Sequence, residues 1–135
     1  MRHFDVQSVE IPAPFDETFT YISDPNRLPD WTHAFRSVAG GRAVLATPRG
    51  AVDVRLDVSA CRERGTIDWS MTFPDGSVGR AYSRLVDAGG DRSIYSFLLL
   101  APPAPLEHIE GALEAQARVL ADELSVLQRK LSRRA

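Results

Sequence analysis

Hydrophobic and polar residues alternate one by one through the middle of the chain. The hydrophobic members of this alternation in the two clearest segments are Val52, Val54, Leu56 and Val58, followed by Ile67, Trp69, Met71 and Phe73. Polar residues such as Asp53, Arg55 and Asp68 occupy the positions between them. A period of two with one apolar face is typical of antiparallel strands that face water on one side. The middle of the chain is therefore predicted to form such strands.

Glycine-rich turn signals separate these segments, among them Gly40-Gly41, Asp75-Gly76 and Gly89-Gly90. Such pairs supply the positive φ angles that tight hairpin turns require. The predicted strands are Phe4–Ile11, a short piece near Phe35–Val38, Arg42–Thr47, Ala51–Cys61, Thr66–Phe73, Ser77–Val86 and Arg92–Leu100. We therefore predict an antiparallel sheet of about seven strands.

The segment after the first strand changes to a helical pattern. Pro14 suits the first position of a helix, and Phe15, Phe19 and Ile22 recur at helical spacing. Asp24 precedes a proline, which disfavours helical backbone at that residue, and its side chain can cap a second short turn. The pattern predicts two short helices between the first two strands.

A hydrophobic stripe at helical spacing closes the chain. Its members are Leu106, Ile109, Leu113, Ala117, Leu120, Leu124, Leu127 and Leu131. From Leu113 onward this spacing also fits a coiled-coil seam, which leaves a homodimer open. A single long helix beside an apolar sheet face should first cover that face, so we predict that the stripe packs against the sheet.

The composition limits the possible number of domains, partners and cellular locations, but it does not indicate a function. The 135 residues suit one domain over 1–135, with 44% hydrophobic and 25% charged residues. The formal net charge of −2 gives no electrostatic indication of a nucleic-acid partner. Cys61 is the only cysteine, which excludes a disulfide framework and a cysteine metal cluster. No signal peptide or membrane-spanning run is evident, so we expect a cytoplasmic protein without membrane insertion.

The stretch VEIPAPFDETFTYISDPNRLPDW, residues 9–31, resembles the opening signature of the START/SRPBCC superfamily, in its bacterial polyketide cyclase/dehydrase-like branch. The turn at Asp75–Ser77, the stretch Gly89–Phe97 and the long terminal helix lie where that superfamily has its later hairpins and helix. The resemblance implies an α+β helix-grip fold, in which a curved antiparallel sheet wraps around the C-terminal helix. Members of the superfamily bind lipids, hormones, polyketides or quinones between sheet and helix. A minority catalyse cyclisation, dehydration or hydrolysis, and others act on a protein partner.

Strand alternation indicates which residues would face such a cavity. On Ser77–Val86, Arg80 and Arg84 assign one face to water, which leaves small residues on the inner face. The resemblance puts Tyr95 and Phe97 inside, and Ile94, Leu98 and Leu100 then form an outer apolar patch. The predicted cavity residues are Trp31, Phe35, Val54, Leu56, Trp69, Met71, Ala81, Ser83, Tyr95, Phe97, Ile109, Leu113 and Gln116.

Few residues in the chain could carry out chemistry. His33 follows Trp31 by two and is a candidate acid or base at the pocket mouth, with Tyr95 as a second candidate. Glu123 flanks the helix stripe on the same side as Gln116 and is the only carboxylate that could approach the interior. We favour its interpretation as a solvent-paired residue at the rim. His3 and His108 form no metal-binding motif, so neither a metal nor a cofactor is predicted.

Three functions fit these observations. The first is binding of a small hydrophobic molecule, of the lipid, polyketide or aromatic class, between sheet and helix. The second is a cyclase, dehydratase or hydrolase that uses the same cavity with His33 or Tyr95. The third is a protein-interaction module that works through the outer face of the last strand. The absence of a predicted buried charged pair favours the first.

Overall fold

The computed structural model describes residues 3–47, 50–101 and 113–134. The seven strands are β1 (Phe4–Ile11), β2 (Phe35–Ala39), β3 (Arg42–Thr47), β4 (Gly50–Cys61), β5 (Thr66–Thr72), β6 (Val78–Gly89) and β7 (Arg92–Leu100). The helices are α1 (Phe15–Ser23), the 3-10 turn η1 (Pro25–Arg27), α2 (Leu28–Trp31) and α4 (Leu113–Arg134). The predicted strands and the short helical segments between the first two strands are confirmed.

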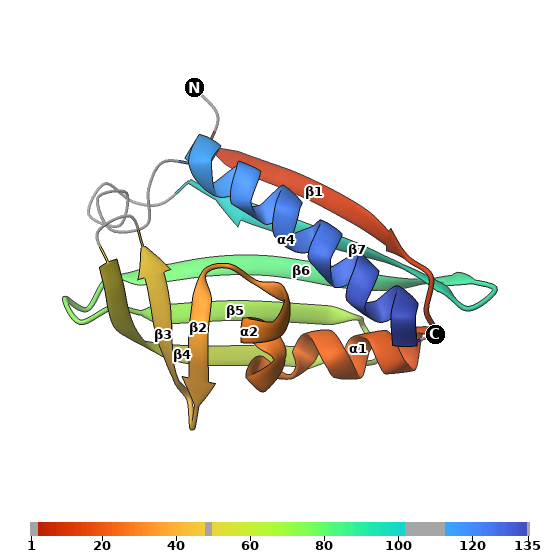
Figure 1. Cartoon of the computed structure of the whole chain (residues 1–135), viewed down its shortest axis with the longest axis horizontal. Helices are drawn as coiled ribbons and strands as arrows, with labels where there is room; N and C mark the ends of the chain where they lie inside the picture. The colour runs from red at the N-terminus through yellow and green to blue at the C-terminus, as the bar shows by residue number, and fades with distance from the viewer. Residues whose placement is uncertain (1–2, 48–49, 102–112, 135) are drawn as a thin grey trace.

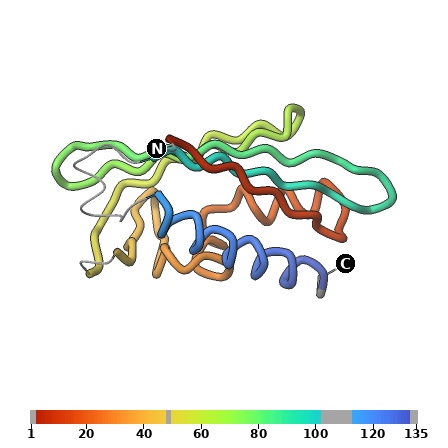
Figure 2. The backbone as a smooth tube through the Cα atoms, turned by 90° about the horizontal axis from the view of Figure 1, so that it is seen from above, coloured from red at the N-terminus to blue at the C-terminus, as the bar shows by residue number. Residues whose placement is uncertain are grey.

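The strands form one antiparallel sheet in the order β1-β7-β6-β5-β4-β3-β2. The first strand therefore pairs with the last, while the other neighbours follow one another along the chain. The helices lie together on one face of this sheet, and the other face carries none of them (Figures 1 and 2). This arrangement is the predicted α+β helix-grip fold.

Local chemistry explains the segment between β1 and β2. Asp16 and Glu17 lie in the first turn of α1, where carboxylates favour the positive end of the helix dipole. The Asn26 backbone N–H donates to Asp24 Oδ1 at 3.0 Å, which starts η1 as predicted. Phe19 and Ile22 are buried and fix α1 against one end of the sheet.

Helix α4 crosses the covered face of the sheet diagonally (Figure 1). Its stripe is buried within the chain at Leu113, Ala117, Leu120, Leu124, Leu127 and Leu131. Two glutamine amides tie the helix to β1. Gln7 Nε2 donates to the Ala117 carbonyl at 2.8 Å, and Gln128 Nε2 donates to the Glu10 carbonyl at 2.7 Å. The predicted packing of the stripe is confirmed from Leu113 onward; Leu106 and Ile109 lie outside the described residues.

One glycine sets how closely the turn between β4 and β5 approaches strand β6. Gly65, in the turn between β4 and β5, has φ +72°, which L side chains rarely adopt. A Cβ at this position would lie 2.1 Å from the Leu85 carbonyl oxygen. The Leu85 N–H also donates to the Gly65 carbonyl at 2.7 Å. This contact closes the end of the sheet that α1 covers.

Candidate functional site

A cavity of about 620 Å³ lies between the sheet and helix α4, at the end where α2 and β2 face the helix. The sheet contributes Trp69, Met71, Ala81, Phe97 and Leu99 to its wall. The wall continues with Phe35 of β2 and Leu45 of β3 from the same sheet, with Leu28 and Trp31 of α2, and with Gln116, Val119, Leu120 and Glu123 of α4. Most of these side chains are apolar, as in sites that hold small hydrophobic molecules.

The structure brings seven of the predicted cavity residues together around this space: Trp31, Phe35, Trp69, Met71, Ala81, Phe97 and Gln116. Strand alternation put the sheet members on the inner face, and helical spacing put Gln116 beside the stripe. Ile109 lies outside the described residues.

Five predicted cavity residues do not line this space. Val54, Leu56 and Leu113 are buried core residues that the cavity does not reach. Ser83 is also buried, and its hydroxyl donates to the Ile67 carbonyl at 2.5 Å. Tyr95 is fully buried, with its ring edge-on to Phe97 at a centroid distance of 6.3 Å. Alternation identifies the inner face of a strand, but it does not tell which part of that face borders a void.

The burial of Tyr95 also bears on its candidacy as an acid or base. Burial raises the pKa of its hydroxyl far above the usual range, and nearby Ser83 and Trp69 oppose this only in part. The hydroxyl therefore stays protonated near neutral pH. Because Tyr95 does not line the cavity, a molecule held there does not contact it in this arrangement.

Glu123 lies deeper in the structure than the interpretation favoured from the sequence. Its side chain is only 7% exposed and lines the cavity, so its interpretation as a solvent-paired rim residue is wrong. The backbone N–H groups of His33 and Ala34 both donate to Glu123 Oε2, at 2.6 and 3.2 Å. The available signal was its position seven residues after Gln116, two turns further along the same flank.

The electrostatics of Glu123 follow from this position. Burial raises the pKa of its carboxyl group, and the negative charge of Asp122 acts in the same direction. The two backbone N–H groups and the charge of His33 lower the pKa and oppose that rise in part. A carboxyl with a raised pKa in a cavity wall is typical of functional sites, although structural networks also produce it.

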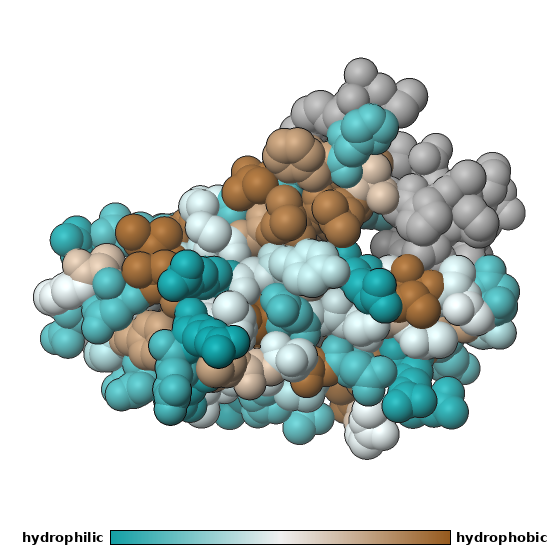
Figure 3. Space-filling model, turned by 180° about the vertical axis from the view of Figure 1, so that it is seen from behind, coloured by the Kyte–Doolittle hydropathy of each residue, from teal (hydrophilic) through white to brown (hydrophobic). Residues whose placement is uncertain are grey.

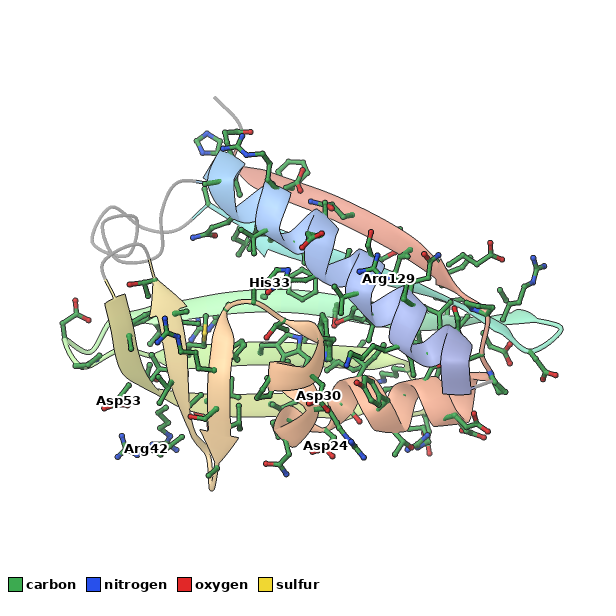
Figure 4. All side chains as sticks on the ribbon, viewed as in Figure 1. Asp24, Asp30, His33, Arg42, Asp53 and Arg129 are labelled. Carbon is green, nitrogen blue, oxygen red and sulfur yellow. The ribbon has the colours of Figure 1, made fainter. Side chains whose placement is uncertain are left out.

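His33 lies at the rim beside α4 (Figure 4). Its Nε2 atom is 2.5 Å from Asp122 Oδ2, and both side chains are more than half exposed. The ring therefore borders the cavity and open solvent at once. The sequence placed it at the pocket mouth, and the structure shows it among the residues that line the cavity.

No group of three or more His, Cys, Asp or Glu residues in the described part of the chain could hold a metal ion. No helix among the described residues is long and apolar enough to cross a membrane.

The outer face of the sheet carries an apolar patch over β1, β7 and β6. Phe4 and Val6 are 56% and 54% exposed, and they pair with Leu100 and Leu98 of β7. Tyr82 of β6 continues the row next to Leu98. Hydrophobic residues gather on this face in Figure 3. Ile94, Leu98 and Leu100, the predicted outer patch, lie on this same face.

No protein-family model matches the chain, and no curated protein matches its sequence. Solved structures do match its shape. The protein XoxI from Bacillus cereus has a TM-score of 0.70 at 17% identity, covering 96% of each chain. A START superfamily protein from Mycobacterium smegmatis gives 0.68 at 13% identity, covering 99% of this chain and all of its own. The Zhui aromatase/cyclase from Streptomyces sp. R1128 has a TM-score of 0.69 at 14% identity, and the match covers 97% of this chain and 94% of that one.

These likenesses establish the class of fold. Along nearly its whole length the chain shares the fold of these structures, among them a START superfamily protein and two aromatase/cyclases. The resemblance noted in the sequence is thus confirmed for the fold. Identities below one fifth carry no activity from those proteins to this one.

Proposed function

We propose that this chain binds a small, largely hydrophobic molecule in the cavity between its sheet and helix α4. The observation that carries the proposal is the cavity itself, with about 620 Å³ of space and mainly apolar walls. Apolar walls around a space of this size present hydrophobic area that a bound apolar molecule would bury. The lipid, polyketide and aromatic classes all match these walls.

Burial of apolar area would supply most of the binding free energy, at about 25 cal/mol per Å² before the cost of association. Trp69 and Phe97 on the sheet and Trp31 opposite provide aromatic surfaces for a flat or chain-like body. The polar residues Gln116, Glu123 and Thr32 line the same space and can orient the molecule.

Saturable binding of the neutral dye N-phenylnaphthylamine tests the proposal. We expect about one site per folded chain, with fluorescence that rises on binding. Ala81→Phe should abolish most of this binding, because Ala81 faces the cavity and a phenyl ring there would fill it. Ala121→Phe is the matched control, since Ala121 is an exposed residue of α4. Equal binding by both variants, or none by the parent, would contradict the proposal.

The chemical class of the natural molecule can be read by native mass spectrometry of protein purified from its own host. A retained mass that is present in the parent and absent in Ala81→Phe would come from this cavity. The same mass in both would come from another surface of the protein.

A second candidate function is catalysis of cyclisation, dehydration or hydrolysis in the same cavity. The observation that favours it is the titratable pair at one end, with Glu123 in the wall and His33 at the rim. General acid–base groups contribute about 10²–10⁴-fold to rate. Turnover of a recovered ligand that is lost in His33→Gln or Glu123→Gln, with affinity retained, would favour catalysis. Unchanged ligand after long incubation with the parent would favour binding alone.

A further inference from the structure

We infer that the molecule bound in this cavity carries a hydrogen-bond-donating head group, an ammonium or a hydroxyl, that pairs with Glu123. The inference rests on the proposed binding function and adds to it the polarity of the ligand. The reason is that only one of the two oxygens of this buried carboxylate accepts hydrogen bonds from the described residues.

The two carboxylate oxygens of Glu123 have different surroundings. Oε2 accepts both hydrogen bonds, from the His33 and Ala34 backbone N–H groups. Oε1 accepts none from the described residues, and it is not among the fully enclosed polar atoms. Since the side chain lines the cavity, Oε1 is an acceptor that remains available to a bound molecule. The indole nitrogens of Trp31 and Trp69 differ from Glu123 Oε1 in this respect, because protein atoms enclose both nitrogens.

The charge of His33 acts on Glu123, but the two side chains form no salt bridge. No Lys, Arg or His among the described residues forms a salt bridge with Glu123. Arg80 also lines the cavity but is an exposed residue of β6, and His33 pairs with Asp122 instead. A buried carboxylate without a cation carries a desolvation cost, which a donor on the ligand would offset. That cost also raises the pKa of Glu123.

The same charges argue against an anionic head group at this end. A carboxylate or phosphate beside Glu123 would face one negative charge directly and a second from Asp122 next to it in the chain. Like charges in a partly buried site are strongly unfavourable. The expected ligand is therefore an amine or alcohol with an apolar body, and not a free fatty acid.

A competing explanation is that Glu123 only holds the loop before β2 against α4. Glu123→Gln separates the two roles. The glutamine oxygen can accept the His33 and Ala34 hydrogen bonds, while its NH₂ group takes the place of Oε1. The loop contact is kept, and the group facing the cavity changes from an acceptor to a donor. Asp122→Asn is the control: it removes the neighbouring negative charge, which also pairs with His33, but Asp122 itself does not line the cavity.

The test is displacement of N-phenylnaphthylamine by four matched ligands: naphthylmethylamine, naphthylmethanol, acetylnaphthalene and naphthoate. The parent should bind the amine about 10–100-fold more tightly than acetylnaphthalene, as expected for one charge-assisted hydrogen bond, with the alcohol between them and naphthoate weakest. Glu123→Gln should lose or reverse this order. Asp122→Asn should keep the amine ahead of acetylnaphthalene and should weaken only the exclusion of naphthoate.

Each result has a definite reading. A parent that binds the dye but not the amine preferentially, or an order that Asp122→Asn changes as much as Glu123→Gln, overturns the inference and leaves the binding function intact. A parent that binds no dye overturns both. If Glu123→Gln does not fold, the parent's preference is measured against pH. It should weaken as acid protonates Glu123, and His33→Gln should show the same pH dependence. A preference that persists in acid overturns the inference.

Discussion

The same strands and the same helix form both ends of the space under helix α4, but their inward side chains are packed more tightly at one end than at the other. Near α1, the inward residues Ile67, Leu85, Tyr95 and Leu127 are all buried to 1% exposure or less. Towards α2, the inward residues of the same strands and helix are Met71, Ala81, Phe97 and Gln116, and each is only partly buried. The first group is called the packed end and the second the cavity end. Alternation continues through both, so the difference lies in which side chains occupy the inner positions.

Side-chain size explains much of this difference. On β6, Leu85 fills the packed end, while Ala81 and Gly79 leave room at the cavity end. On α4, the packed end receives Leu127 and Leu131, and the cavity end receives Gln116 and Glu123 beside the stripe. The molecule therefore combines a rigid support with a hollow section, which suits a site that must keep its shape while it binds a ligand.

The largest expected effect is from Leu127→Ala at the packed end. We expect a loss of about 2–5 kcal/mol in the free energy of unfolding, because the side chain is fully buried and its removal leaves a void. Leu120→Ala, where the side chain borders the existing cavity, should cost less. Urea denaturation of both variants measures the difference. Equal losses would mean that the two ends are packed alike.

Gly65→Ala should destabilise the packed end next most strongly. The positive φ alone costs a non-glycine residue about 1–2 kcal/mol, and the new Cβ would press on the Leu85 carbonyl. Gly76→Ala is a matched control, since its φ is also positive and a Cβ there meets nothing within 4 Å. The extra loss of stability in Gly65→Ala, compared with Gly76→Ala, measures the cost of the contact between the new Cβ and the Leu85 carbonyl. If thermal unfolding shows no excess loss for Gly65→Ala, the turn at Gly65 does not lie this close to the Leu85 carbonyl of β6.

The sequence predicted the fold better than the site, and the residues show why. Strand alternation and the leucine stripe are periodic signals, and together they allow few arrangements other than one sheet covered by one helix. Val54, Tyr95 and Phe97 carry the same inward signal, yet only Phe97 borders the cavity. Which inward residue meets a void depends on residues from other strands and helices. The burial of Glu123 likewise depends on two backbone N–H groups about 90 residues away, at His33 and Ala34.

Enlarging a small inward residue should give opposite results at the two ends. Ala13 is 1% exposed near the packed end, so Ala13→Leu should lower the free energy of unfolding by about 1–3 kcal/mol through overpacking. Ala81→Leu should be close to neutral in stability, because its side chain can extend into the cavity, and it should weaken dye binding. Calorimetry and dye titration together check this pair. A large loss of stability in Ala81→Leu would mean that the cavity walls do not tolerate added volume.

The smallest effect we predict is a pH-dependent one at the cavity end. Burial raises the pKa of Glu123 in the folded state above its unfolded value. Between these two values the folded chain binds more protons than the unfolded chain, so this group lowers stability as the pH rises through the window. Glutamine does not titrate. The stability of Glu123→Gln relative to the parent should therefore increase as the pH is raised from the ordinary glutamate range towards neutrality.

Urea denaturation at a series of pH values measures this difference. Glu10→Gln serves as the control, because Glu10 is an exposed residue that pairs with Arg92 at 2.9 Å. Its relative stability should not improve with pH, since glutamine loses that surface ion pair. A relative stability of Glu123→Gln that stays flat or falls with pH would mean that the two backbone N–H groups fully compensate the burial of the carboxylate. The ligand would then have no unmet charge to satisfy at this end, and the polarity inferred for it would lose its energetic basis.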